Sequence, residues 1–280
     1  MTNHTNNEQL SALWRALLFI QNNLHEDLSL EQIATVAGFS AYHFHRLFKT
    51  FTGESVKSYI RRLRLENAAF RLKTQKEQII DIAFDSGFYT HETFTRAFNK
   101  KFGINPSEYK KEKKAFSDSY LKNIKQVYFK KRHCIFKRYI GPYENSGIPT
   151  DNKSLWHSLI GYLPSNMKDI TKLELFGISY DDPSITEHKN IRYDACISVP
   201  DNFSQTETSL ILKEGFYISA DHIGPFNELT KSYHYLIYNW LALYNYSIDE
   251  NIAPFEQFHI SKRDRYHKID CITIFIPIKK

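Results

Sequence analysis

Apolar residues in the first part of the chain recur every three or four positions, as Leu13, Leu17 and Ile20 illustrate. Residues at that spacing share one face of an α-helix and can pack together in a core. The pattern continues to about residue 114. We therefore expect this part to be an all-α domain.

Beyond residue 125 the pattern changes to short runs rich in β-branched and aromatic residues, with Gly-Pro and Asn or Asp turns between them. The predicted strands include residues 126–129, 134–139, 192–199, 216–222 and 269–276, and the apolar, aromatic segments 173–176 and 255–258 are predicted strands as well. Amphipathic stretches near residues 153–163 and 229–244 predict helices between them. The second half therefore has the pattern of an α+β domain.

A polar, lysine-dense segment over residues 110–125 separates the two halves and shows little apolar periodicity. A chain of 280 residues also favours two domains, because a single hydrophobic core seldom grows that large. We predict a multidomain protein with an all-α domain over residues 8–113, a linker over 114–125 and an α+β domain over 126–280.

Each half contains an internal repeat. In the first half, residues 33–39 recur as 82–88, and the phenylalanine and arginine positions of 44–48 recur in 94–98. In the second half, Ile140-Gly141-Pro142-Tyr143 recurs as Ile223-Gly224-Pro225-Phe226, followed by further matches in the same order. We interpret the first repeat as two helix-turn-helix units and the second as two α+β modules related by a pseudo-twofold axis, with a cleft at their junction.

The spacing within each unit of the first repeat is that of a helix-turn-helix motif. Ser29 and Ser40 are placed to cap its two helices, and Gly38 stands at the sharp turn, where a left-handed backbone is needed. Apolar positions of the second helix predict a buried stripe made of Phe44, Leu47, Phe48 and Phe51 in the first unit and of Phe94, Phe98 and Phe102 in the second.

The opposite face of each second helix carries side chains that can read base edges in a major groove. Arg46 and Arg96 occupy equivalent positions, and a guanidinium group there can bond a guanine edge with two hydrogen bonds. The other predicted DNA contacts on these helices are Tyr42, His45, Lys49, His91, Glu92, Thr95 and Lys100. A face that is merely solvated is the alternative for each of them.

A basic helix of about 17 residues, roughly 26 Å long, is predicted between the two units. It would place the two reading helices near one DNA turn apart, so that one chain reads two successive major grooves. Phosphate contacts are expected from the basic residues of this helix and of the segments after the second reader, namely Lys57, Arg61, Arg62, Arg64, Arg71, Lys100, Lys101, Lys110 and Lys111.

The distribution of charge supports a polyanionic partner for the first half. The formal net charge is +6, and residues 1–124 hold 18 Lys and Arg against 13 Asp and Glu, whereas the remainder holds 19 against 18. A basic excess confined to one domain favours binding to nucleic acid, here double-stranded DNA.

The sequence also predicts a cytoplasmic protein that has no membrane span, cofactor or metal site. Its apolar stretches fall short of the roughly 20 residues that cross a bilayer, and its first residues lack the features of a secretory signal. The three cysteines, Cys134, Cys196 and Cys271, have the spacing of neither a disulfide framework nor a zinc site. We expect them to be reduced, half-buried strand residues.

Residues 10–113 resemble the two-unit DNA-binding domain of AraC/XylS-type transcription regulators. The resemblance rests on Asp81-Ile82-Ala83, Gly87-Phe88, residues 94–98 and residues 102–109. It implies that base contacts come from Tyr42, His45 and Arg46 in the first reader and from His91, Glu92, Thr95 and Arg96 in the second. Because this domain comes first in the chain, the arrangement resembles that of the Rob-like branch.

Glu174 and Glu256 stand inside apolar, aromatic segments at matching places of the second repeat. A carboxylate among aromatic rings is costly to bury unless it meets a cation or hydrogen-bond donors. Either both carboxylates face water, or they line an aromatic cleft for a cationic or polar organic ligand.

Residues 126–280 resemble the GyrI-like effector-binding domain through the Gly224-Pro225-Phe226 turn, the helix with Trp240, residues 255–258 and the strand at 272–277. The resemblance implies that Glu256 is the pocket carboxylate. Candidate walls of the pocket are Tyr143, Trp156, Tyr193, Phe226, Tyr233 and Trp240.

These observations predict a DNA-binding transcription regulator, not an enzyme, whose second half binds a small cationic or amphipathic effector. One alternative is a GyrI-like hydrolase joined to a DNA-binding domain, with Glu256 as its general base. Another is a second half that docks a protein partner such as RNA polymerase. No Ser-His-Asp, Cys-His or metal-ligand spacing supports catalysis.

Overall fold

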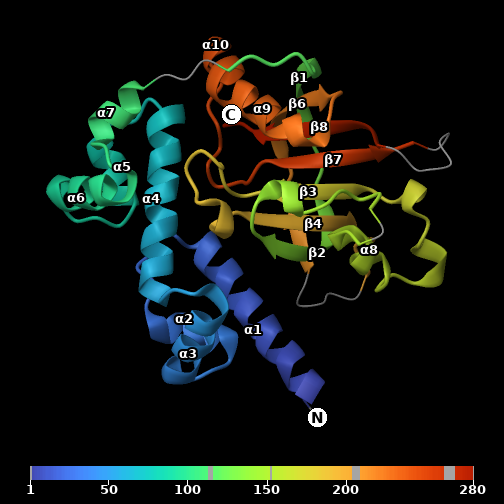
Figure 1. Ribbon diagram of the computed structural model, residues 1–280, viewed down its shortest axis with the longest axis horizontal. Coiled ribbons are helices and arrows are strands. Elements are labelled where there is room, and N and C mark those ends of the chain that lie inside the picture. Colours follow the sequence, from blue (N-terminus) through green and yellow to red (C-terminus); the bar gives the residue numbers. More distant parts are fainter. Residues whose placement is uncertain (1, 113–115, 152, 204–208, 262–268, 280) are drawn as a thin grey trace. The chain divides into compact units, whose positions relative to one another are not determined.

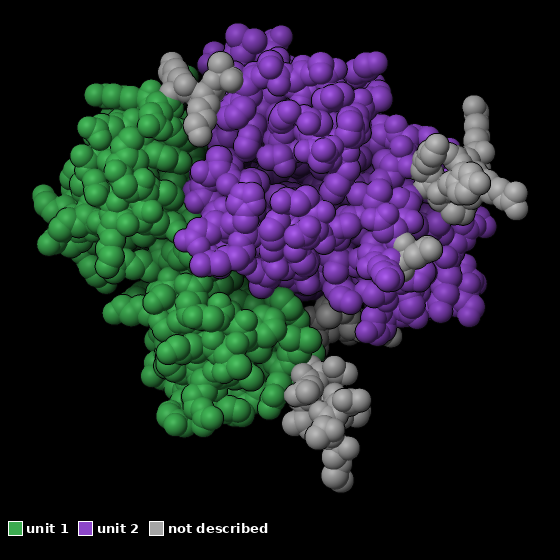
Figure 2. All heavy atoms as spheres, in the orientation of Figure 1, with its two compact units in different colours: residues 1–113 green, residues 114–280 purple. Residues whose placement is uncertain are grey.

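The structure is a computed structural model that describes residues 2–112, 116–151, 153–203, 209–261 and 269–279. They form two compact units, which Figure 2 colours separately: residues 1–113 and residues 114–280. The first unit is helical and the second is rich in β-structure, which confirms the predicted two-domain organisation. The boundary predicted at residues 113 and 114 lies outside the described residues.

The first unit is made of helices (Figure 1). Their bounds are α1 (Thr2–Asn22), α2 (Leu30–Ala37), α3 (Ala41–Thr52), α4 (Val56–Thr74), α5 (Ile79–Asp85), α6 (His91–Phe102) and α7 (Pro106–Lys111). Helices α2 and α3 form one helix-turn-helix unit and α5 and α6 form the other, with α4 between them. The predicted helices of both units are therefore present at the expected places.

Local hydrogen bonding explains where these helices begin and turn. The Ser29 hydroxyl accepts from the Gln32 backbone N–H, and the Gln32 side chain accepts from the Ser29 N–H, which forms a capping box. Ser40 caps α3 by accepting from the His43 N–H. Gly38 has a φ of 76°, in the left-handed region that side chains with a Cβ seldom adopt.

Aromatic residues fill the core of the first unit much as their spacing predicted. Phe44 and Phe48 in α3 are completely buried, and so are Phe94 and Phe98 in α6. Phe51, predicted to belong to the same stripe, is 37% exposed. It lies at the end of α3, where only the edge of Trp14 packs against its ring, at a centroid distance of 5.3 Å.

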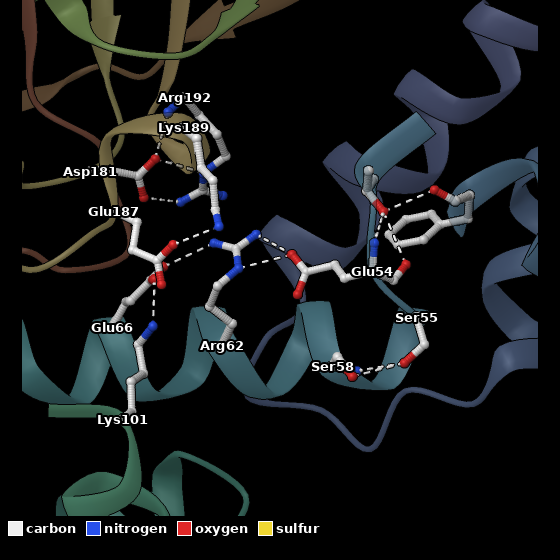
Figure 3. A network of polar contacts seen from close by, with 12 residues as sticks. Glu54, Ser55, Ser58, Arg62, Glu66, Lys101, Asp181, Glu187, Lys189 and Arg192 are labelled. Carbon is white, nitrogen blue, oxygen red and sulfur yellow. Dashed lines mark hydrogen bonds and ion pairs between the residues drawn. The ribbon is translucent and has the colours of Figure 1, made fainter. Parts of the chain in front are cut away.

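A network of ion pairs joins the central helix α4 to α6 and to the turn between α3 and α4 (Figure 3). Arg62 donates to Glu54 at 2.6 Å and to Glu66 at 3.1 Å, and Lys101 of α6 lies 3.0 Å from the other oxygen of Glu66. The Glu66 side chain is only 5% exposed. Removing one member of a buried ion pair leaves an uncompensated charge, so this network resists displacement of α6 from α4.

The described residues of the second unit form one eight-stranded sheet. Its strands are β1 (Leu121–Phe129), β2 (Arg132–Ile140), β3 (Leu175–Ser179), β4 (Arg192–Ser198), β5 (Ser209–Leu212), β6 (Gly215–His222), β7 (Phe255–Ile260) and β8 (Ile269–Pro277). They lie in the order β1-β6-β8-β7-β3-β4-β2-β5, and every pair is antiparallel (Figure 1). Strand β1 lies at one edge of the sheet and β2 near the other, yet only residues 130 and 131 connect them. Because so short a connection keeps the two strands close together, the sheet must curl.

Two results differ from the predicted element boundaries. Residues 121–125, expected in the linker, form the first half of β1 and pair with β6. Their side chains are mostly polar because β1 is an edge strand whose burial is low until Phe129. Strand β5 has no counterpart among the predicted strands.

Each face of the sheet has its own set of side chains. One face is covered by α8 (Leu155–Ile160), which packs on β2 and β4, and by α9 (Leu229–Tyr235). The other face holds a cluster of aromatic rings in which Phe129 contacts Phe176, Tyr217, Phe255 and Phe275. Phe129 comes from the edge strand, so these contacts are possible because the sheet curls.

Candidate functional site

Helix α3, the predicted reading helix of the first helix-turn-helix unit, presents a tyrosine and an arginine to solvent. Tyr42 is 75% exposed, and the Arg46 guanidinium lies 5.9 Å from the centroid of its ring. Lys49 is exposed on the same helix, and His45 is half-buried. The four predicted contacts therefore lie on one helix, with Arg46 restrained by Tyr42 one turn before it.

The equivalent helix α6 holds its arginine beside a carboxylate instead of a ring. Arg96 and Glu92 are exposed and stand four residues apart, which makes them neighbours on the helix surface. Hydrogen bonds at the start of the helix, from its own backbone and from Thr90, lower the pKa of Glu92, and His91 and Arg96 lower it further. The lowered pKa favours the ionised form of Glu92 in the free protein.

The remaining predicted contacts of α6 differ in accessibility. His91 and Lys100 are exposed. The hydroxyl oxygen of Thr95 is enclosed by protein and has no hydrogen-bond partner among the described residues. In this conformation Thr95 cannot reach a base with its hydroxyl group. Any contact of Thr95 with DNA would have to come from its methyl group, beside Arg96.

Five of the predicted phosphate contacts are engaged within the protein instead. Arg62 and Lys101 belong to the buried charge network around Glu66. Arg64 donates to the backbone carbonyls of Leu24 and Glu26, Arg71 pairs with Glu77 and Asp85, and Lys110 donates to the Glu77 carbonyl. Lys57, Arg61, Lys100 and Lys111 are exposed, so the phosphate contacts that the sequence predicts for them stay a prediction. Arg62, Arg64 and Arg71 of α4 stabilise the fold because they bind carboxylates and backbone carbonyls of the same domain.

In the second unit, Glu256 of β7 is a buried carboxylate held by hydroxyl groups. It is 1% exposed, its Oε1 accepts from the Tyr193 hydroxyl at 2.6 Å, and its Oε2 accepts from the Tyr233 hydroxyl. Ser179 donates weakly to Oε2 at 3.5 Å. Burial raises the pKa of Glu256 more than these hydrogen bonds lower it, and the pKa lies at about 7.

Gly177, which sequence reasoning did not single out, makes room for this carboxylate. It stands directly opposite Glu256 in the register of β3 and β7. A Cβ at this position would lie 1.9 Å from the Tyr193 hydroxyl and 2.3 Å from the Glu256 Oε1. Only glycine therefore allows Tyr193 to reach across β3 to Glu256.

Most of the predicted aromatic walls surround Glu256. Tyr143 contacts the ring of Tyr193 at 5.7 Å, and Trp156 contacts it at 5.9 Å. Trp156 also packs on Phe258, which in turn lies 6.4 Å from Phe226. Phe258 and Glu256 are two residues apart in one strand, so their side chains share a face of the sheet.

Trp240 is not part of this cluster. Its ring stacks on Tyr246 at 5.7 Å and packs on Tyr244 at 4.4 Å. Tyr246 in turn donates to Gln126 of the edge strand β1. Helix α9 brings Tyr233 to the carboxylate, and Trp240, seven residues further along the chain, faces a different part of the sheet.

A hollow of about 270 Å³ lies on the same face of the sheet as Glu256. It is lined by Ile148, Thr150, His222, Gly224, Phe226, Ile269, Asp270, Cys271 and Ile272. Ile272 pairs with both Phe258 and His222 in the sheet, so the hollow adjoins the aromatic cluster. Its walls are mainly apolar, and Asp270 adds a carboxylate.

Glu174 has a different environment, although the repeat places it at the position that matches Glu256. Its side chain is 41% exposed and pairs with Arg132 at 2.8 Å. Of the two alternatives left open by the sequence, exposure to water therefore holds for Glu174, which pairs with a cation at the surface, whereas Glu256 is enclosed among aromatic rings.

Ser232, His222 and Asp118 come together although no sequence spacing suggested it. The Ser232 hydroxyl donates to Asp118 at 2.6 Å and lies 2.8 Å from the His222 Nδ1. In a nucleophilic triad the histidine stands between the other two residues, so that it can take the proton of the serine. Here the serine stands in the middle and is fully buried, so the arrangement joins parts of the fold.

The sequence also missed a buried ion pair on the opposite face of the sheet. Arg138 of β2 and Asp194 of β4 form two hydrogen bonds of 2.7 Å, with side chains 1% and 0% exposed. Tyr180 donates to the same carboxylate. Asp194, a carboxylate inside the mostly apolar strand β4, was the available signal.

The cysteines are more buried than expected. Cys134 and Cys196 are almost completely buried and Cys271 is partly buried, and all three are free thiols. Burial raises the pKa of Cys134 to about 12, which keeps it protonated.

Comparison with known proteins agrees with both halves of this geometry. A helix-turn-helix family model matches residues 33–112, and the family model of the GyrI-like small molecule binding domain matches residues 122–279. The chain belongs to the AraC family and, in its second half, to the GyrI-like family.

Three curated relatives each match between a third and two fifths of this chain. The chain is 42% identical over 106 residues to the uncharacterized HTH-type transcriptional regulator YbfP of Bacillus subtilis, covering 38% of this chain and 36% of that protein. It is 41% identical to the transposon Tn10 TetD protein of Escherichia coli, over 35% of this chain and 70% of TetD. It is 36% identical to the right origin-binding protein of Escherichia coli, over 37% of this chain and 36% of that protein. The match thus spans about a third of two of these three relatives.

In the part of the chain that the structure describes, no helix of this AraC-family protein is both long and apolar enough to span a membrane. Nor do the described His, Cys, Asp and Glu residues gather in a group of three or more that could hold a metal ion.

The raised pKa of Glu256 predicts a pH-dependent stability of the GyrI-like domain. Its ordinary pKa is 4.5 and its pKa in the folded protein is about 7, so between these values the folded state holds a proton that the unfolded state releases. The free energy of unfolding should therefore fall by up to about 3 kcal/mol as the pH rises from 4.5 to 7. Urea denaturation at pH 5 and pH 7.5 measures this difference.

The Glu256→Gln variant isolates the contribution of this carboxylate. It should lack this part of the pH dependence, whereas Glu174→Gln should retain it because Glu174 is partly exposed and paired with Arg132. An unchanged pH dependence in Glu256→Gln would show that another group is responsible.

Proposed function

We propose that this protein is a transcription regulator that binds a specific DNA sequence with α3 and α6 and responds to a small amphipathic cation bound at Glu256. The observation that carries the proposal is the pair of exposed arginines, Arg46 and Arg96, at equivalent positions of two reading helices. Cationic side chains at such positions bond guanine edges in the major groove.

The charge network of α4 supports simultaneous reading by both helices. Glu66 ties α6 to α4 through Lys101, and Glu54 ties the turn after α3 to the same helix through Arg62. Two readers fixed on one rod keep a constant separation, which is what two successive major grooves require. The exposed Lys57, Arg61, Lys100 and Lys111 supply phosphate contacts.

The Glu256 cluster supports a cationic effector. Its carboxylate is surrounded by aromatic rings, which attract cations, and Phe226 at the edge of the same cluster lines an apolar hollow that suits the organic part of a ligand. With a pKa of about 7, Glu256 is partly protonated near neutral pH, and a cation that binds next to it favours the ionised form. Binding should therefore release a proton.

The strand order supports the proposed pseudo-twofold relation of two α+β modules. From the centre outward, β3-β4-β2 on one side match β7-β8-β6 on the other. Each triplet includes a predicted repeat segment, and α8 and α9 are the helices of the two modules. The junction of the modules is the β3–β7 pair, where Gly177 faces Glu256.

Binding is favoured over hydrolysis because both carboxylate oxygens of Glu256 are engaged by hydroxyl groups. A general base needs a free oxygen within reach of the water or proton that it acts on. Docking of a protein such as RNA polymerase on the aromatic cluster is disfavoured because Trp156 and Tyr193 are buried.

The proposal is tested by selection of duplexes from genomic fragments, followed by mobility-shift titrations across a salt series. We expect one duplex class to bind at least about 1000-fold more tightly than bulk DNA. Binding that depends on salt but never on sequence would contradict the proposal. Addition of the aromatic cation benzyltrimethylammonium should then change the affinity for the selected duplex.

A further inference from the structure

We infer that residues 116–120, which join the DNA-binding half to β1, are docked on the GyrI-like domain, and that the Glu256 site controls whether they stay docked. We call these residues the connector. This inference rests on the proposed function, because it concerns how the effector acts on DNA binding. The connector is anchored to the same helix that supplies Tyr233 to Glu256.

Phe116 is the first anchor. Its backbone N–H donates to the Asn239 side chain at 3.2 Å, and its ring lies 4.8 Å from His234 and 5.6 Å from Tyr238. These partners stand on α9 and on the π-helical turn that follows it, Leu236–Trp240. A π-helical turn is rare and is often found at functional sites.

Asp118 is the second anchor and the most highly connected one. One carboxylate oxygen accepts the backbone N–H groups of Tyr120 and Leu121, and the other accepts the Ser232 hydroxyl. Ser232 is completely buried and precedes Tyr233 in the chain. A shift of α9 that moves Tyr233 must therefore also move the partner of Asp118.

Tyr120 forms the third anchor, on the turn after β6. Its carbonyl accepts the Ile223 N–H at 2.9 Å, and its ring lies 5.6 Å from that of His222. A Cβ on Gly224 would lie 2.4 Å from the Tyr120 ring, so the ring rests directly on the glycine backbone. His222 and Gly224 also line the hollow beside Phe226.

The physical coupling follows from competition for Glu256. A cation bound to this carboxylate replaces part of the hydrogen bonding that Tyr233 provides, and α9 loses a tie to the sheet. The serine that holds Asp118 is then displaced, and the connector is released. Release of five residues lengthens the chain between the two domains by up to about 17 Å, which changes how the tethered domains can act together.

Amide hydrogen exchange of the full-length protein tests this inference. The amides of Tyr120 and Leu121 report on the Asp118 anchor because both donate to it. We expect their exchange to rise about tenfold in Tyr233→Phe, which removes the hydroxyl bond to Glu256. Saturating benzyltrimethylammonium should have the same effect on the wild-type protein.

Glu174→Gln is the matched control, since this carboxylate occupies the equivalent repeat position but pairs with Arg132 at the surface. It should leave both amides unchanged. Unchanged exchange at Tyr120 and Leu121 in Tyr233→Phe would overturn the inference, whether or not the probe cation binds.

DNA binding provides the second arm of the test. Asp118→Asn should reproduce the effect of the cation on duplex affinity and weaken any further response to it, and Phe116→Ala should do the same if Asp118→Asn does not fold. Asp201→Asn, an exposed aspartate with a side chain 79% exposed, is the control. Specific DNA binding with an intact response in both anchor variants would overturn this inference alone, whereas absence of specific binding by the wild-type protein would overturn the proposed function.

Discussion

Replacement of Arg46 or Arg96 by alanine is expected to weaken binding to the selected duplex by about 5- to 150-fold each, at constant salt. Both side chains are exposed on the reading helices and are held one turn after a partner, Tyr42 in α3 and Glu92 in α6. Each variant loses hydrogen bonds to a base edge, so discrimination between duplexes should fall together with affinity.

The measurement is a set of competition titrations with the selected duplex and with duplexes altered at one position. Lys111→Ala is the control: Lys111 is an exposed lysine at the end of α7 that we expect to contact phosphate, so its loss should weaken binding to all duplexes uniformly. If the arginine variants weaken every duplex by the same factor, the two arginines bind the backbone and do not read bases.

Gly177→Ala is expected to remove effector binding while DNA binding by the first half survives. The added Cβ would overlap the Tyr193 hydroxyl and the Glu256 carboxylate, at 1.9 Å and 2.3 Å, so at least one of them must leave its place. Displacement of the Glu256 carboxylate should weaken binding of benzyltrimethylammonium by about 100-fold or more, because the cation then loses the buried negative charge that it pairs with.

Isothermal titration with this cation, together with mobility shifts of the selected duplex, checks the expectation. Gly161→Ala is a suitable control because Gly161 has a helical backbone and its Cβ would meet only the Ser158 carbonyl, at 3.1 Å. Tyr193→Phe tests the same site without overlap and should have a smaller effect in the same direction. Undiminished cation binding in Gly177→Ala would place the effector away from Glu256.

The helix-turn-helix units could be predicted closely because their signals are local. Ser29, Gly38 and Ser40 act on backbone groups within four residues, and the aromatic stripe of each reader repeats at the period of a helix. The exposed arginines followed from the same periodicity. Helical phase tells which side chains point outward, but it does not tell what they meet.

The misassigned phosphate contacts show that limit. Arg62, Arg64 and Arg71 belong to the basic helix α4, yet they bind carboxylates of the protein, namely Glu54, Glu66, Glu77 and Asp85, and the backbone carbonyls of Leu24 and Glu26. Glu66 lies one turn further along α4, and the other partners lie in the turns beside α4, on α5 or after α1. Their positions depend on how the helices pack.

The effector site was partly predictable for the same reason. Glu174 and Glu256 stood out because a carboxylate inside an aromatic strand is unusual, and the resemblance to the GyrI-like domain favoured Glu256. Tyr193 and Tyr233, which were grouped with Glu256, do contact it. Trp240 was wrongly grouped, since the helix after α9 carries it toward Tyr246. Gly177 and Asp118 carried no local signal, because the first matters through strand pairing and the second through a serine 114 residues away.

By itself, the sequence determined the helices and most strands, the two-domain order, the outward faces of α3 and α6 and the presence of two carboxylates inside aromatic strands. These depend on capping groups, on the period of apolar positions and on the cost of burying a charge, all of which act over a few residues. Only the tertiary structure decided which basic residues remain exposed, which of the two matching glutamates is enclosed, and that residues 116–120 rest on the helix of Tyr233. Those outcomes are set by side chains that meet across helices and strands far apart in the chain, where no local pattern specifies the partner.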